Sequence, residues 1–366
     1  MTSRTGKWLR AACASAAVAL VAAGCSSGSS GGSAALPQYG PPEQTTLNVG
    51  VVPAEDSAGF FVALDEGLFA KEGLTINYTP QGSSETAIGL QMKGQLDISG
   101  GNYVSYVEAV AEKHDPLEVI SEGSIMTPGS QVIYTPKGSG ITSVTQLKGK
   151  TVAVNAPENI DFLLDESVLS GYGIKVNQGT GTSAGEVNFP SQPISFPTMA
   201  GTVAAKGSPY VAATLPEPFA SLAEQGAGFV PLVDLDQGAT QQFPIEGYVV
   251  TKQWAAAHPN SLKRFLAALE QGQEIADTDR SAVEKAFEDI KSTAKGVPAA
   301  AFGAVPPEIA AVMTLNTYPI GIDKTRLQRV ADVMQQFGLL SRSFNVSTMI
   351  MPQSAFNFAP YGGSNS

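Results

Sequence analysis

The sequence of 366 residues predicts an α/β fold divided into two lobes. Strand-like alternating runs and amphipathic helical patterns follow one another along the chain, which predicts parallel-rich sheets covered by helices on both faces. About 340 residues remain after a predicted export signal, more than a single hydrophobic core usually holds. Two apolar segments, 131–134 and 247–251, flank the second α/β region and are expected to be the crossings between the lobes.

The first region reads as repeated β-α-β units. A strand over 47–51 precedes a helix that Ser57 is expected to cap and that ends near Gly73. The pattern then continues with a strand over 74–78, a helix from Gly82-Ser83-Ser84 to Gly94, a strand over 96–99 and a helix from Tyr103.

The second region carries strand patterns at 151–154 and 210–213. After the second crossing the chain turns helical and is expected to pack back onto the first lobe. One of these helices has Asn260 as its expected cap, and another runs from Asp323 to Gly338. The stretch 179–197 is rich in Gly, Ser, Thr and Pro and is expected to be a loop or a poorly formed hairpin.

These patterns divide the chain into five expected parts. They are a signal peptide at 1–24, a flexible tether at 25–44, a first lobe at 45–134 and 247–340, a second lobe at 135–246, and a C-terminal tail at 341–366.

The N-terminus has the charge pattern of an export signal. Three basic residues precede the apolar run 11–23, and no acidic residue occurs before Cys25. The segment Leu20–Cys25 resembles the bacterial lipobox, in which the cysteine is acylated and becomes the mature N-terminus, although Ala22 stands where Leu is usual. The alternative is a plain secretory signal that leaves Cys25 as an ordinary thiol.

A Ser/Gly-rich run follows Cys25 and is typical of a flexible tether. We therefore expect an exported protein held at the outer face of the cell membrane by lipidated Cys25. Cys13 would leave with the signal, so the mature chain could form no internal disulfide.

Charge and hydropathy exclude several classes of partner. Three of the 22 basic residues and none of the 33 acidic ones lie in the first 24 residues, so the mature chain has a net charge of −14. Such a charge argues against nucleic-acid binding. No apolar stretch beyond the signal is long enough to span a bilayer, so the lipid anchor is the expected membrane contact, and we expect a monomer.

Four ordered segments carry a family resemblance: 56–74, 94–98, 147–155 and 216–219. In this order the chain resembles the SsuA/THI5-like (NMT1-type) substrate-binding proteins of ABC transporters. The resemblance implies the type II periplasmic-binding-protein fold, with two hinge crossings and a ligand cleft between the lobes. It also implies two partners encoded elsewhere, a permease and an ATPase.

Ligands of open α/β sheets bind beyond the carboxyl ends of strands, where helix N-termini present free N–H groups. Five loops of this kind supply the expected ligand-binding residues. These are Asp56, Ser57, Ser83, Ser84, Asn102, Tyr103, Asn155, Glu158, Asn159, Glu217 and Phe219. Each also has a plainer role, because serines cap helices, aromatic residues pack in cores and glutamates are commonly solvated.

The same loops contain several carboxylates and no Lys or Arg. Helix N-termini favour anions by about 0.3–1 kcal/mol each, but these carboxylates oppose that effect. We therefore expect a neutral or cationic small organic ligand.

Two other classes of function stay open. An enzyme like the THI5-type pyrimidine synthases would need an active-site histidine, whereas His114 and His258 both read as surface turn residues, and the cysteine-rich motif of those synthases is absent. We expect no catalytic residue, no metal site and no cofactor. A lipoprotein that uses this fold as a ligand sensor, or as an accessory of another surface complex, is equally compatible with the sequence.

Overall fold

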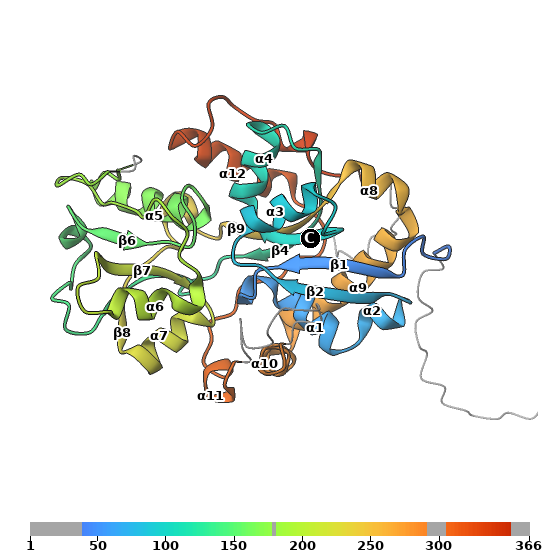
Figure 1. The fold of residues 1–366 in the computed structure, drawn as a ribbon, viewed down its shortest axis with the longest axis horizontal. Helices are drawn as coiled ribbons and strands as arrows, with labels where there is room; N and C mark the ends of the chain where they lie inside the picture. The colour runs from blue at the N-terminus through green and yellow to red at the C-terminus, as the bar shows by residue number, and fades with distance from the viewer. Residues whose placement is uncertain (1–38, 178–180, 291–304, 353–366) are drawn as a thin grey trace, which may run out of the picture. The chain divides into compact units, whose positions relative to one another are not determined.

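The computed structural model describes residues 39–177, 181–290 and 305–352. The expected signal peptide, Cys25 and most of the expected tether lie outside these residues, as does the end of the expected tail. Two β-sheets organise the described chain, and helices lie on their faces (Figure 1).

The first sheet has the strand order β2-β1-β3-β9-β4. Its strands are β1 (Thr46–Val51), β2 (Thr75–Pro80), β3 (Ile98–Asn102), β4 (Leu117–Ile125) and β9 (Pro244–Thr251). The second sheet has the order β6-β7-β5-β8. Its strands are β5 (Gln131–Pro136), β6 (Thr151–Ala153), β7 (Tyr210–Pro216) and β8 (Phe229–Asp234).

Both sheets are mixed, which differs from the expected parallel-rich arrangement. β1 pairs in parallel with β2 and β3, and β6 pairs in parallel with β7. The pairings of β9 with β3 and β4, and of β5 with β7 and β8, are antiparallel. A parallel pair needs a long crossover connection, usually a helix, whereas β4, β5, β8 and β9 adjoin the passages between the sheets.

The chain passes between the sheets at 126–130 and again at 235–243. The expected crossing segments, 131–134 and 247–251, lie instead inside β5 and β9, each of which is hydrogen-bonded on both sides. Central strands buried on both faces read as continuous apolar runs, which is why these segments were conspicuous. The lobe boundaries derived from them stay a prediction.

Twelve helices and four short 3₁₀ turns occur in the described residues. The helices are α1 (Ala58–Asp65), α2 (Leu68–Lys71), α3 (Ser84–Met92), α4 (Tyr103–Ala111), α5 (Ile160–Gly171), α6 (Phe196–Ala204), α7 (Phe219–Ala227), α8 (Lys252–Ala257), α9 (Pro259–Thr278), α10 (Arg280–Glu288), α11 (Pro307–Ala310) and α12 (Lys324–Gln336). The 3₁₀ turns are η1 (Glu55–Ser57), η2 (Val144–Leu147), η3 (Gly238–Thr240) and η4 (Val346–Thr348). None of these helices combines the length and the hydropathy needed to cross a membrane.

The long helix α9 packs against α1, as expected for a helix that returns to the first lobe. Gly59 and Gly272 meet at this crossing, and a Cβ at Gly272 would lie 2.2 Å from the carbonyl oxygen of Gly59. Only glycine therefore allows the two backbones this separation. The helix expected to end near Gly73 is broken into α1 and α2, because Gly67 adopts a φ of +65° that a right-handed helix does not contain.

Asn260 does not cap α9, which begins one residue earlier at Pro259. Instead, the Glu43 carboxylate accepts hydrogen bonds from the backbone N–H groups of Asn260 and Ser261, both at 3.0 Å. An anion at a helix N-terminus is favoured by the free N–H groups and the helix dipole. The final residues of the expected tether are thus bound to the first lobe.

The helix expected from Asp323 is confirmed as α12. The Asp323 carboxylate accepts from the backbone N–H groups of Thr325 and Arg326, and the helix buries an apolar face that includes Leu327 and Val330. Next to this cap, Arg326 Nε donates at 2.9 Å to Glu122 Oε2 on β4. Glu122 is fully buried, so the guanidinium compensates a charge that water cannot reach.

We expect Arg326→Ala to destabilise the protein by about 2–4 kcal/mol, because Glu122 would be left buried without its cation. Urea unfolding at pH 7.5 measures this free energy. Lys113→Ala is the control, since Lys113 pairs with Glu108 at the surface and its loss should change stability by less than about 0.5 kcal/mol. Equal effects of the two substitutions would contradict the role of Arg326.

Candidate functional site

A cavity of about 30 Å³ lies between the two sheets and is lined by residues of both. Asp56, Ser84, Asn102 and Glu246 come from the first sheet and its helices. The second sheet and its helices contribute Gln131, Asn155, Asn159, Asp161 and Phe196. We refer to this cavity as the cleft.

Asp56 lies in the 3₁₀ turn that follows β1, beside the fully buried Glu55. The amide of Asn316 holds both carboxylates, since Nδ2 donates to Asp56 Oδ1 at 2.8 Å and to Glu55 Oε2 at 3.0 Å. The two acidic side chains are thereby kept close together at the end of a buried strand.

Glu246 projects from the central strand β9 and is 3% exposed. Ser57 Oγ donates to Glu246 Oε1 at 2.5 Å. The neighbouring strand makes room with glycine, because a Cβ at Gly100 would lie 3.1 Å from Glu246 Oε1 and 2.8 Å from the Tyr248 ring. The carboxylate is thus positioned by the sheet itself.

Asp161 lies in the first turn of α5, after the strand β6. Its Oδ2 accepts from the backbone N–H of Asn155 at 3.1 Å, which closes the loop between strand and helix. Asn159 caps the same helix by accepting from the N–H of Phe162. This loop brings an acidic residue from the second sheet to face Asp56.

Ser84 and Asn102 form the wall between α3 and α4. Ser84 Oγ accepts from both the backbone N–H and the side-chain Nδ2 of Asn102, each at 2.9 Å. A Cβ at Gly101 would lie 2.4 Å from that Oγ, so this position requires glycine. Asn102 Oδ1 in turn caps α4 by accepting from Ser105 N–H.

Two hydrogen bonds cross the cleft directly. Asn155 Nδ2 donates to the carbonyl oxygen of Gly82 at 3.0 Å, and the backbone N–H of Glu55 donates to the carbonyl oxygen of Glu217 at 3.0 Å. A cavity of about 30 Å³ has room for a water or two, whereas ligand pockets typically measure about 300–1,000 Å³. The two walls must therefore separate before a solute can enter.

Burial and mutual repulsion raise the pKa values of the acidic groups around the cleft. Desolvation is the largest cause for each of them. It raises the pKa of Asp56 to about 6 and, with the nearby charges of Asp56 and Glu85, that of Asp161 to about 7. The pKa values of Glu55 and Glu246 lie well above the ordinary value for the same reason, with the Asp56 charge adding to each.

Five of the residues expected at the site line the cleft: Asp56, Ser84, Asn102, Asn155 and Asn159. Two other expected residues stabilise the walls of the cleft without lining it. Ser57 does not cap α1 with its side chain but holds Glu246, and Ser83 caps α3 by accepting from Thr86 N–H.

The remaining four expected residues do not line the cleft. Tyr103 packs in the core, with its hydroxyl directly against Gly247. Glu158 is exposed in a loop on another part of the surface. Glu217 accepts from Ser221 and Thr314 behind the wall, and Phe219 stacks at 5.3 Å on Phe196, which itself lines the cleft.

The lining residues that were not expected at the site include Gln131, Asp161, Phe196 and Glu246. Glu246 and Gln131 stand in or beside apolar strand runs, where a polar residue is costly unless it has a role. That signal was available. Phe196 lies in a segment without periodicity, so only the folded chain shows that it reaches the cleft.

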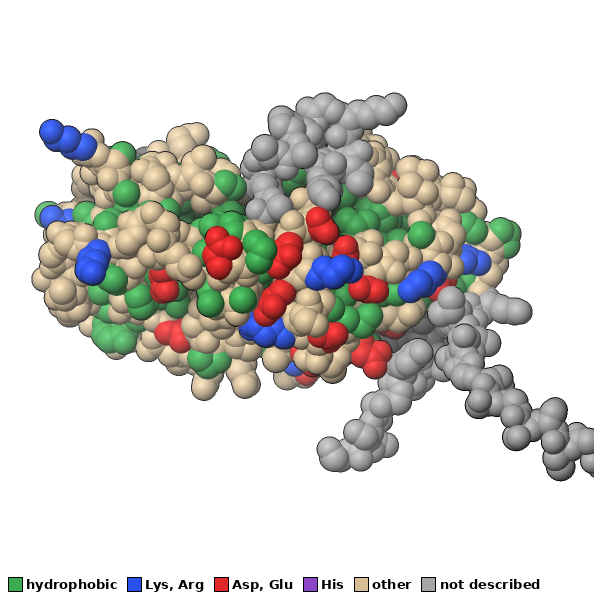
Figure 2. Space-filling view, turned by 90° about the horizontal axis from the view of Figure 1, so that it is seen from below, with side chains coloured by type: hydrophobic (Ala, Val, Ile, Leu, Met, Phe, Trp, Pro, Cys, Tyr) green, Lys and Arg blue, Asp and Glu red, His purple; other side chains and the backbone are tan. Residues whose placement is uncertain are grey.

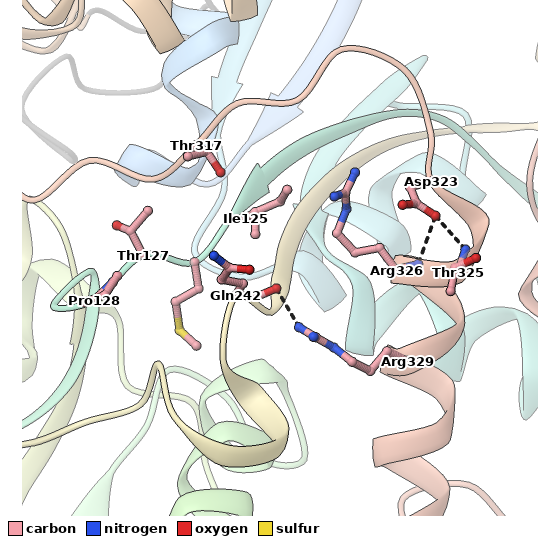
Figure 3. Close-up of a pocket in the computed structure, with 10 residues that line it drawn as sticks. Ile125, Thr127, Pro128, Gln242, Thr317, Asp323, Thr325, Arg326 and Arg329 are labelled. Atoms are coloured by element: carbon pink, nitrogen blue, oxygen red, sulfur yellow. Dashed lines mark hydrogen bonds between the residues drawn. The ribbon is translucent and has the colours of Figure 1, made fainter. Parts of the chain in front are cut away.

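A larger surface pocket of about 440 Å³ lies beside the passages between the sheets (Figure 3). Arg326 and Arg329 line it, and both side chains already make hydrogen bonds within the protein, although the buried Nε of Arg329 has no partner among the described residues. Arg326 binds Glu122, while Arg329 donates to the carbonyl oxygens of Gln241 and Gln242 in the second passage. This pocket therefore reads as part of the connection between the sheets, and the cleft as the candidate binding site.

In the part of the chain that the structure describes, no group of three or more His, Cys, Asp or Glu side chains is arranged to hold a metal ion. The arrangement suits an organic molecule with several polar contacts.

Comparison with known proteins places these features in a family. A model described as NMT1/THI5 like matches residues 54–279. The bicarbonate-binding protein CmpA of Synechococcus elongatus is 26% identical over 142 residues, which cover 37% of this chain and 30% of that protein. The match thus spans less than a third of the length of this relative.

Solved structures share the fold at low identity. The alkanesulfonate-binding protein SsuA from Xanthomonas axonopodis pv. citri, solved with MOPS bound, has a TM-score of 0.65 and 17% identity, covering 84% of this chain and 99% of that one. The periplasmic nitrate-binding protein NrtA from Synechocystis PCC 6803 has a TM-score of 0.65 and 14% identity, covering 87% of this chain and 92% of that one. The predicted two-lobed α/β fold of the periplasmic binding proteins is confirmed.

We expect Asp161→Asn to stabilise the ligand-free protein increasingly as the pH rises. Folding raises the pKa of Asp161 from 3.8 to about 7, so ionisation of this carboxyl group favours the unfolded state. The parent protein therefore has its full stability below about pH 4 and loses stability as the pH rises through 7. The variant should gain roughly 2–4 kcal/mol over the parent between pH 4.5 and 7.5 in urea unfolding. Glu158→Gln, at an exposed position, is the control, and a gain that does not change with pH would contradict the assignment.

Proposed function

Because the chain belongs to the NMT1/THI5-like family, we propose that it is the solute-binding protein of an ABC importer. It captures a small organic molecule outside the cytoplasm, in the cleft between the two sheets. It then delivers this molecule to a permease and an ATPase that other chains supply.

The observation that carries the proposal is the construction of the cleft from both sheets. Polar side chains from both walls face one cavity, and the two direct hydrogen bonds across it are few enough to break and reform. Two passages of chain, at 126–130 and 235–243, connect the walls. Closure of two lobes around such passages is a recurrent way to enclose a ligand.

We further propose that Cys25 is acylated and anchors the protein to the outer face of the membrane. Each buried methylene contributes about 0.8 kcal/mol, so two or more acyl chains retain a protein stably. The basic and apolar N-terminal pattern, the small residues before Cys25 and the Ser/Gly-rich run after it support this proposal.

A binding role is favoured over an enzymatic one. Neither histidine lines the cleft: His114 lies in an exposed turn, and His258 stacks on Trp254 at 4.9 Å beside the start of α9. The polar groups of the cleft can bind a molecule in one orientation and release it again without a covalent step. A sensor lipoprotein is the second candidate, and adjacent permease and ATPase genes would favour import, whereas an adjacent kinase gene would favour sensing.

We expect Cys25→Ser to release the protein from membranes into the soluble fraction, because the acylated sulfur would be absent. Fractionation of cells that express the parent and the variant measures the distribution. Retention of Cys25→Ser on membranes washed with high salt would contradict the lipid anchor.

We expect the purified full chain, kept in detergent, to gain thermal stability with one class of a panel of sulfonates, aminopyrimidines, flavin-like rings, amines and nitrate. A ligand at a hundred times its Kd adds about 2.7 kcal/mol. Asn155→Ala should weaken that binding about two- to tenfold, because it removes a hydrogen bond that holds the walls together. Glu158→Ala, outside the cleft, should bind like the parent, and a panel without any binder would count against a solute-binding role.

A further inference from the structure

The cleft contains three acidic residues and, among its described lining residues, no basic one. Asp56, Asp161 and Glu246 are 7%, 1% and 3% exposed, and they come from a turn, a helix and a strand that are far apart in the sequence. The fully buried Glu55 lies directly behind Asp56. Three separate elements thus bring negative charge to one cavity.

Elsewhere in the described chain, two buried acids are compensated by arginine, whereas the buried Asp165 and Glu217 rely on hydrogen bonds alone. Glu122 is paired with Arg326 at 2.9 Å, and Glu72, which is 2% exposed, lies 3.6 Å from Arg264. Burying a carboxylate costs several kcal/mol unless a cation or several hydrogen bonds compensate it. The acids of the cleft have some hydrogen bonds, but no described Lys or Arg forms an ion pair with them.

Two buried acceptors that line the cleft have no hydrogen-bond partner in the described part of the chain. Asp161 Oδ1 and Gln131 Oε1 are fully buried and receive no hydrogen bond from the described residues; Glu55 Oε1 behind the wall is in the same state. Two amide donors beside them are engaged, because Asn102 Nδ2 donates to Ser84 and Asn155 Nδ2 to Gly82. A ligand that carries N–H donors would satisfy the two free acceptors.

We propose that the solute carries a positively charged, N–H-bearing nitrogen, as in a protonated amine, amidinium or guanidinium, which binds between Asp56, Asp161 and Glu246. This inference rests on the proposed solute-binding function and names the class of its substrate. The ring of Phe196 lines the same cavity and provides an apolar or cation–π surface for the rest of the molecule.

The proposed charge is opposite to that of the ligands after which the similar proteins are named. Alkanesulfonate, nitrate and bicarbonate are anions, and a site for any of them needs donors or cations facing the ligand. The cleft of this chain has three carboxylates and no basic side chain among its described lining residues. Acidic side chains in the middle of the face drawn in Figure 2 have Lys and Arg side chains among them, and screening limits the reach of these charges to about 8 Å.

Binding of a cation is coupled to proton release. In the ligand-free protein the raised pKa values keep part of the acidic groups protonated near neutral pH. The cation lowers these pKa values, so the protons leave to the solvent as the ligand enters. Affinity therefore rises with pH between about 5 and 8, provided the ligand's own nitrogen stays protonated.

The test compares matched probes with the purified full chain by calorimetry. Benzamidine is paired with benzamide, agmatine with N-butylurea, and methylammonium with methanol, and methanesulfonate, nitrate and bicarbonate represent the anions. We expect binding by at least one cation, at least tenfold weaker binding by its neutral partner, and no binding by the anions. Its Kd should fall at least fivefold from pH 5.5 to 7.5, with heats that vary among buffers of different ionisation enthalpy.

Variants of the acidic residues provide the second readout. Asp161→Asn and Glu246→Gln keep an acceptor oxygen in place but remove the charge, so each should weaken the cation about ten- to hundredfold and reduce its pH dependence. Glu158→Gln is the matched control, since that residue is acidic and lies outside the cleft. Circular dichroism and urea unfolding establish that each variant is folded.

The outcomes separate this inference from the proposed function. Binding of an anion, or of a neutral partner as tightly as its cation, overturns the inference and leaves a solute-binding protein. Cation binding that both variants leave unchanged also overturns it. Failure of every probe class to bind counts against the inference and the proposed function together.

Discussion

The feature on which the rest of the molecule depends is the burial of carboxylates where two mixed sheets meet. Asp56 and Glu246 belong to the first sheet and its turn, whereas Asp161 belongs to a helix of the second sheet, so the three meet only where the two sheets come together. Their repulsion and desolvation oppose closure, whereas the Asn155–Gly82 and Glu55–Glu217 hydrogen bonds favour it. Apolar packing between α4 and α5 also favours the closed arrangement, and a ligand can shift the balance of these opposing free energies.

The scaffold around this junction is built from tighter interactions. Gly59 and Gly272 let α1 and α9 pack backbone to backbone, and Phe69 stacks on Phe265 at 5.1 Å in the same region. On the other side of the first sheet, α12 supplies the guanidinium that compensates Glu122. Rigid walls are what a protein needs when two halves move as bodies.

Local patterns were sufficient to predict most elements of the fold from the sequence. Strands at 47–51 and 74–78 and the helix from Asp323 follow from periodicity and capping alone. The predicted crossings were displaced from the true passages between the sheets. The reason is that β5 and β9 are central strands, and their apolar runs resemble any buried segment. The cleft was predicted only in part, since Asp161 and Glu246 reach it through tertiary packing that no window of sequence contains.

The contacts that Glu43 and Arg264 make near the first described residues have a mechanical consequence. Glu43 binds the N-terminal N–H groups of α9, and Arg264 donates to the carbonyl oxygens of Tyr39 and Gly40. Tyr39, Gly40 and Glu43 are thus held against the first half, and the second sheet is joined covalently to that half through the two passages. In an anchored protein, a force along the tether would act on the first half, and the second half could still move relative to it.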